Sequence, residues 1–121
     1  MSTIVLDLAA TGDSGVFGSF ESGGRFSVQI SWPSTAAGAF TVQASNEPQA
    51  GTQQADGTTA PAPTFVTPTG GTWSALATAD GVSPGNVMVM YDLPAGRYRV
   101  HWARTSGSGK AYINPAFQRT R

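Results

Sequence analysis

Strict alternation of apolar and polar residues along several segments limits the structures that are open to this chain. From Arg25 to Trp32 the large apolar residues Phe26, Val28, Ile30 and Trp32 occupy every second position. The alternation resumes from Phe40 to Ser45, after a breaker segment that contains Pro33 and Gly38. A period of two residues is that of a β-strand with one buried face. The short connection predicts that these two strands pair as an antiparallel hairpin.

Further short strands are separated by glycine and proline along the whole sequence. The clearest hairpin is expected where Val87–Leu93 and Tyr98–Trp102 flank the turn Pro94-Ala95-Gly96. The other strand candidates are Thr3–Leu8, Val16–Phe20, Thr64–Thr67, Thr72–Leu76 and a closing strand Ala111–Ile113 that Asn114-Pro115 ends. No segment has the period of a helix. The tryptophans Trp32 and Trp102 fall in phase with the core positions, while Trp73 fits no clear face.

Short strands that each bury one face need a second sheet opposite them. The sequence therefore predicts one all-β domain over residues 1–121, a two-layer antiparallel sandwich of the jelly-roll kind. An immunoglobulin-like Greek key stays open as the alternative, although the paired cysteines of true immunoglobulin domains are missing. The stretch 46–63, rich in proline, glycine, glutamine and threonine, shows neither period and is expected to be a long surface loop outside both sheets.

Composition and residue spacing argue against most catalytic chemistry. The only histidine is His101, on the polar face of its strand, and the seven acidic residues are scattered singly. The chain has no cysteine, so it can form neither disulfides nor a thiolate nucleophile. The glycine-rich turns do not match a phosphate-binding loop. We expect no enzyme activity, no cofactor and no metal site; without a signal-peptide pattern or an apolar span, we also expect no membrane association.

Two features indicate binding surfaces. Beyond Asp92 the chain has no acidic residue but six of its seven basic ones, and this local excess can steer contact with an acidic protein surface although the net charge is zero. The candidate attachment residues are Arg104, Lys110, Phe117, Arg119 and Arg121, the last two in a basic C-terminal tail. Nucleic acid is a less suitable partner for a neutral chain.

The second feature is a strand that is apolar on both faces. Met88 and Met90 alternate with Val87, Val89 and Tyr91, a pattern that does not suit a face in water. Either another part of the chain or a second subunit must cover the methionine side, and methionine is well suited to adaptable contacts. We favour the subunit, so Met88 and Met90 are the candidate residues of an interface in a homo-oligomer, a dimer or a trimer.

Several segments together resemble the small virion proteins of bacteriophages, the head decoration or cement proteins and related fibre domains. The segments that carry the resemblance are Phe26–Trp32 (FSVQISW), Ala39–Asn46 (AFTVQASN), Thr72-Trp73, Tyr98–Trp102 (YRVHW) and Arg104–Gly109 (RTSGSG). The resemblance covers roughly Phe26 to Ile113; the proline-rich loop and the basic tail depart from it.

The resemblance implies a structural role in a virion. Decoration proteins of this family sit as symmetric oligomers on the major capsid protein and stabilise the shell, which implies assembly in the host cytoplasm and a final location in the particle. The alternative role is that of a tail, fibre or receptor-binding module that binds carbohydrate. A small hydrolase is the third class, and the lack of a nucleophile–base pair in the sequence argues against it.

Overall fold

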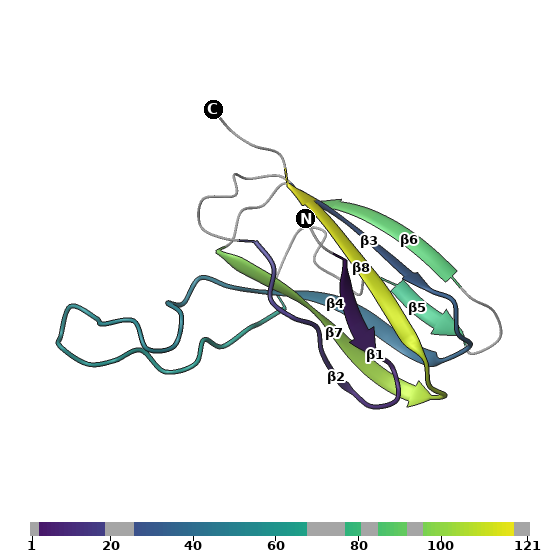
Figure 1. Cartoon of the computed structure of the whole chain (residues 1–121), viewed down its shortest axis with the longest axis horizontal. Helices are drawn as coiled ribbons and strands as arrows, with labels where there is room; N and C mark the ends of the chain where they lie inside the picture. Colours follow the sequence, from purple (N-terminus) through teal and green to yellow (C-terminus); the bar gives the residue numbers. More distant parts are fainter. Residues whose placement is uncertain (1–2, 19–25, 68–76, 81–84, 92–95, 118–121) are drawn as a thin grey trace.

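Two antiparallel four-stranded sheets pack face to face in the computed structural model (Figure 1). It describes residues 3–18, 26–67, 77–80, 85–91 and 96–117. Sheet A has the order β1-β8-β3-β6 and sheet B the order β2-β7-β4-β5. The strands are β1 (Ile4–Asp7), β2 (Gly12–Asp13), β3 (Phe26–Trp32), β4 (Ala37–Ser45), β5 (Ala77–Asp80), β6 (Gly85–Tyr91), β7 (Arg97–Ser106) and β8 (Lys110–Phe117). The predicted sandwich is confirmed.

The strand order is that of a jelly roll. Four nested antiparallel pairs join β1 with β8, β2 with β7, β3 with β6 and β4 with β5. The pairing of β3 with β8 completes sheet A, and that of β4 with β7 completes sheet B. The chain thus doubles back as one long ribbon that is wrapped into two layers, the arrangement of eight-stranded jelly rolls. The immunoglobulin-like alternative has a different order of strands and does not describe this chain.

Both hairpins expected from the sequence are wrong. β3 lies in sheet A and β4 in sheet B; likewise β6 lies in sheet A and β7 in sheet B. The short connections therefore cross between the layers. Alternation reveals which face of a strand is buried, but it does not distinguish a neighbour beside the strand from one across the core.

Several strand bounds also differ from the expected ones. Lys110–Phe117 is a full eight-residue strand, so Asn114-Pro115 does not end it. Pro115 is tolerated because β1 begins at Ile4, opposite Ile113, which leaves the part of β8 after Ile113 without a neighbouring strand on that side among the described residues. Phe17 and Val66 make only isolated bridges instead of the two strands predicted around them. The whole candidate strand Thr72–Leu76, with Trp73, and the Pro94-Ala95 turn lie outside the described residues.

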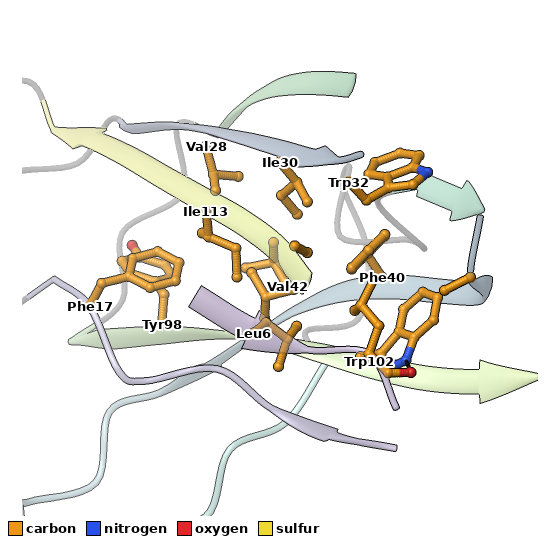
Figure 2. Packing of buried hydrophobic residues seen from close by; sticks show 14 of the residues in the cluster. Leu6, Phe17, Val28, Ile30, Trp32, Phe40, Val42, Tyr98, Trp102 and Ile113 are labelled. Carbon is orange, nitrogen blue, oxygen red and sulfur yellow. Dashed lines mark hydrogen bonds between the residues drawn. The ribbon is translucent and has the colours of Figure 1, made fainter. Parts of the chain in front are cut away.

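The core between the sheets is built on a run of three aromatic rings (Figure 2). Phe40 of β4 lies between Trp32 of β3, at 5.0 Å between ring centroids, and Trp102 of β7, at 4.5 Å. Trp32 and Trp102 are buried, as their phase in the sequence predicts. Around them pack the remaining buried residues Leu6, Leu8, Phe17, Val28, Ile30, Ala36, Val42, Ala44, Tyr98, Val100, Ala111 and Ile113.

Each of these two indoles also covers a glycine of the neighbouring strand. A Cβ atom on Gly38 would lie 2.6 Å from the Trp102 ring, and one on Gly85 would lie 2.2 Å from the Trp32 ring. Such distances are far below van der Waals contact, so the two tryptophans need glycine beside them in order to lie flat on the sheets. Across the described residues no helix is long and apolar enough to cross a bilayer.

Candidate interaction surfaces

Three outward features of the sandwich could make contact with a partner. The first is the outer face of sheet A, which we call the neutral face. Its outward side chains are mainly small, amide or apolar: Val5, Ser27, Gln29, Ser31, Asn86, Met88, Tyr112, Asn114 and Ala116. They project outward because the residues that alternate with them fill the core.

The neutral face combines exposed apolar groups with amides. Val5 is 54% exposed, Met88 61% and Tyr112 38%. The Gln29 amide donates to the Asn86 side-chain oxygen at 3.0 Å, and the Thr3 hydroxyl donates to that of Asn114. A partner can cover such a face at little cost in free energy, because few charged groups have to be removed from water.

Among the described residues, charged side chains occur at only one end of the neutral face. Lys110 Nζ lies 3.4 Å from Asp7 Oδ2, with both side chains more than half exposed. The pKa of Asp7 is lowered by the backbone N–H of Ala9, which donates to its carboxylate, and by the nearby Lys110 ammonium. Lys110 is therefore already paired within its own chain.

The second feature is a polar row on the outer face of sheet B, where Arg97, Arg99 and His101 alternate along β7. Asp13 of β2 is the register partner of His101, and its Oδ1 lies 2.8 Å from His101 Nδ1 and 3.5 Å from Arg99 Nε. Arg99 Nε also donates to Gln43 Oε1 at 2.9 Å. The row is thus a network of partly exposed, paired groups.

Sequence reasoning missed the contact of His101 with Asp13. The two residues are 88 positions apart, and only the pairing of β2 with β7 brings them together. An Asp–His pair can orient an imidazole, but general-base catalysis also needs a nucleophile within reach of the other ring nitrogen. No contact of that kind is made to His101 in the described part of the chain. No group of three or more metal-ligating side chains occurs there either.

The third feature is the long connection after β4, residues 46–67, which we call the arm. It projects away from both sheets (Figure 1), as the loop prediction for 46–63 expected. It is not structureless, however. The backbone of Gly51, Thr52 and Ala60 exchanges hydrogen bonds across the arm, and a tight turn closes it where Gln54 pairs with Thr58 and Gly57.

Polar contacts hold the base of the arm on sheet B. Asn46 Oδ1 accepts from the Gly96 amide at 2.6 Å, and Arg97 donates to the Glu47 carbonyl at 2.8 Å. The guanidinium of Arg99 lies over the Phe65 ring at 4.6 Å, a cation–π arrangement. Arg97 and Arg99 therefore fix the arm, and a role in attracting a partner would compete with these contacts.

Those of the predicted attachment residues that the structure describes are not brought together. Arg104, whose Nε donates to the Gly107 carbonyl, and Lys110 flank the turn between β7 and β8. Phe117 is the last residue of β8, about 23 Å from Lys110 along an extended strand. Arg119 and Arg121 lie outside the described residues, as does the side chain of Phe117. Met88 is exposed on the neutral face; of Met90 the structure describes the backbone, paired with Ser27.

Comparisons with known proteins assign no family. No family model matches the sequence, and no curated protein is similar to it. Among solved structures, the chain is similar to the K3 cleaved adhesin domain of Lys-gingipain from Porphyromonas gingivalis w83, with a TM-score of 0.44 and 14% identity. The match covers 87% of this chain and 62% of that one, so this chain spans less than two thirds of its length. A TM-score of this size carries no argument about function.

Proposed function

We propose that this protein is a non-enzymatic binding module of a virion, a decoration protein that binds an assembled phage capsid and stabilises it through protein–protein contacts. The virion setting rests on the motif resemblance of Phe26–Trp32, Ala39–Asn46 and the later segments. The neutral face is the observation that supports binding: a nearly uncharged sheet surface with exposed Val5, Met88 and Tyr112.

The mechanism we propose is mass action. A ligand that binds the assembled lattice and not its separated subunits raises the free energy needed to open the lattice. This increase grows with the ratio of the free ligand concentration to its Kd. A jelly roll suits this task because its rigid layers hold the contact surfaces at fixed positions. The arm extends the reach of the domain beyond the sandwich (Figure 1).

Two routes of attachment follow from the surfaces. Attachment through the basic tail would weaken as salt is added, because screening reduces attraction between exposed charges. Attachment through the neutral face would be nearly independent of salt. We expect the tail to contribute, since Arg119 and Arg121 follow the end of β8 and positive charge favours contact with an acidic partner surface.

The experiment that tests this function begins with mass spectrometry of purified virions of the phage or prophage that encodes the chain, which should detect it in many copies. Binding of the labelled protein to particles stripped of it is then measured at low and high salt. Removal of 118–121 should weaken binding at low salt and leave the melting temperature unchanged. The cut is placed after Phe117 because that residue belongs to β8.

The matched control is Tyr112→Ala, which changes the neutral face and leaves every charge in place. If the truncated protein binds as tightly as the full chain at both salt concentrations while Tyr112→Ala weakens binding, attachment runs through the neutral face. If the protein is absent from particles and binds none, the proposed function is wrong.

A carbohydrate-binding fibre module is the second candidate function. One observation favours it: Tyr112 is 38% exposed on the neutral face, and amide side chains of Asn114, Gln29 and Asn86 lie on the same face. An aromatic ring flanked by amides can stack on a sugar and hydrogen-bond its hydroxyls. A glycan array with the wild-type protein and Tyr112→Ala separates the two functions, because only a lectin would show binding that the substitution abolishes.

A further inference from the structure

One edge of sheet A, that of β6, has no hydrogen-bonding partner strand among the described residues. The outermost strand, β6, pairs along its whole length with β3, from Gly85 opposite Trp32 to Tyr91 opposite Phe26. None of the described residues pairs with the other side of β6. In an antiparallel sheet, alternate residues direct their N–H and C=O groups to opposite sides. The outer side of β6 therefore offers a row of donors and acceptors to another strand.

β6 lacks the features that normally protect a sheet edge. Proteins use short edge strands, charged side chains, prolines or bulges for that purpose. The other edge strands are short: β1 and β5 have four residues each and contain Asp7 and Asp80, and β2 has two residues. In contrast, β6 has seven residues, GNVMVMY, without a charge or a proline. Its pairing with β3 runs in one register without a bulge.

The side chains next to this edge allow a close approach. Met88 is 61% exposed, and Asn86 beside it is exposed and bonded to Gln29. β3 and β6 contain no charged residue. A second copy of the same strand could therefore dock without desolvating a charge and without repulsion between like charges. A homodimer that pairs charged edge strands would incur both of these costs.

We propose that β6 pairs antiparallel with β6 of a second copy of this chain, about a two-fold axis at Met88, and so joins two A sheets into one continuous sheet. A two-fold axis between identical antiparallel strands must pass between a residue and its own copy. Met88 is the fourth of the seven residues, so this axis alone pairs the full length of both strands. It sets Val87 opposite Val89 of the partner subunit.

This inference specifies the self-association that the Met88 and Met90 pattern predicts, and it does not depend on the virion setting. A fibre module or a decoration protein could use the same dimer. The failure of one proposal therefore leaves the other standing, since particle binding and dimerisation are measured separately.

The first test uses single cysteines, which is possible because the native chain has none. At the proposed axis, Met88→Cys places two cysteines directly opposite each other with Cα atoms about 4.5–5.5 Å apart, within the range for a disulfide. The control is Asn86→Cys on the same strand and exposed face, whose copies would be about 13 Å apart. Mild oxidation should cross-link Met88→Cys and not Asn86→Cys, as measured by non-reducing electrophoresis and intact mass.

The second test measures the oligomer itself by sedimentation velocity over a range of concentrations. Met88→Lys places two ammonium groups opposite each other at the axis, and we expect the dimer Kd to rise by about fivefold or more. The control is Val5→Lys, an equally drastic change at 54% exposure on the opposite edge strand of the same sheet, which should leave the dimer intact. Circular dichroism checks that both variants fold.

Three outcomes would overturn the proposal. In the first, the wild-type protein is monomeric at every concentration. In the second, Asn86→Cys cross-links as readily as Met88→Cys, which would indicate random collision or another register. In the third, Val5→Lys dissociates the dimer as fully as Met88→Lys, which would place the interface on the sheet face. If Met88→Lys fails to fold, the cysteine pair still decides the question, because cysteine at that exposed site does not introduce a charge.

Discussion

Substitution of Gly85 by alanine tests the packing that holds sheet A against the core. Gly85 is the register partner of Trp32, and directly opposed residues project from the same face of a sheet. An added Cβ would lie 2.2 Å from Trp32 Cζ2 and 2.5 Å from Cε2. The indole would have to move by more than 1 Å to restore van der Waals contact at about 3.5–4.0 Å. It cannot move freely, because the Phe40 ring lies behind it at 5.0 Å between centroids.

The expected loss of stability follows from two opposed terms. Overpacking a core with an added methyl group costs about 1–3 kcal/mol. Alanine recovers about 0.5–1 kcal/mol relative to glycine within a strand, because the unfolded chain has less conformational freedom to lose. We therefore expect Gly85→Ala to lower the free energy of unfolding by about 1–2 kcal/mol and the melting temperature by about 4–8 °C.

Urea unfolding followed by tryptophan fluorescence measures this loss. Gly12→Ala is the matched control, because a Cβ there meets nothing within 4 Å; it should be neutral or slightly stabilising. Trp32→Phe should cost less in the Gly85→Ala background than in the wild type, since the smaller ring relieves the clash. If Gly85→Ala proves as stable as Gly12→Ala, or if the two substitutions are additive, the proposed contact does not limit the packing.

Three more predictions concern the arm and the polar row. Replacing residues 51–59 by a short Gly-Ser link should leave the melting temperature, measured by calorimetry, nearly unchanged, because the backbone hydrogen bonds of this part stay within the arm. A fall of several degrees would mean that the tip of the arm stabilises the fold. The hydroxyl and the amide of Thr58 donate to the Asp56 carboxylate and lower its pKa. The contact therefore stabilises the turn above the unfolded pKa of about 3.9, and this stabilisation is lost as the pH falls through the lower pKa of the folded state. Hydrogen exchange of the Thr58 amide should accelerate in that pH range, and an unchanged protection factor would contradict this. Asp13→Asn should reduce the free energy of unfolding by less than about 1 kcal/mol, because exposed ion pairs contribute little; a larger loss in urea unfolding would show that the Asp13 contacts anchor β2.

Many of the buried residues could be predicted from the alternation pattern alone. Period-two alternation marks one face of each strand, and Trp32, Val28, Ile30 and Trp102 are in the core as that pattern requires. The absence of a helical period and the spacing of turn residues were enough for an all-β sandwich. These properties are local, because the side chains of a strand alternate whatever lies beside it.

Which strands are neighbours could not be predicted in this way and is known from the complete fold. The sequence predicted β3–β4 and β6–β7 hairpins, but the chain crosses between the layers at both connections. The same wrapping brings Asp13 to His101 and separates Lys110 from Phe117, and it leaves β6 at an edge. Pairing partners far apart in sequence are chosen by the total burial of both sheets, a property of the whole chain that no single segment carries.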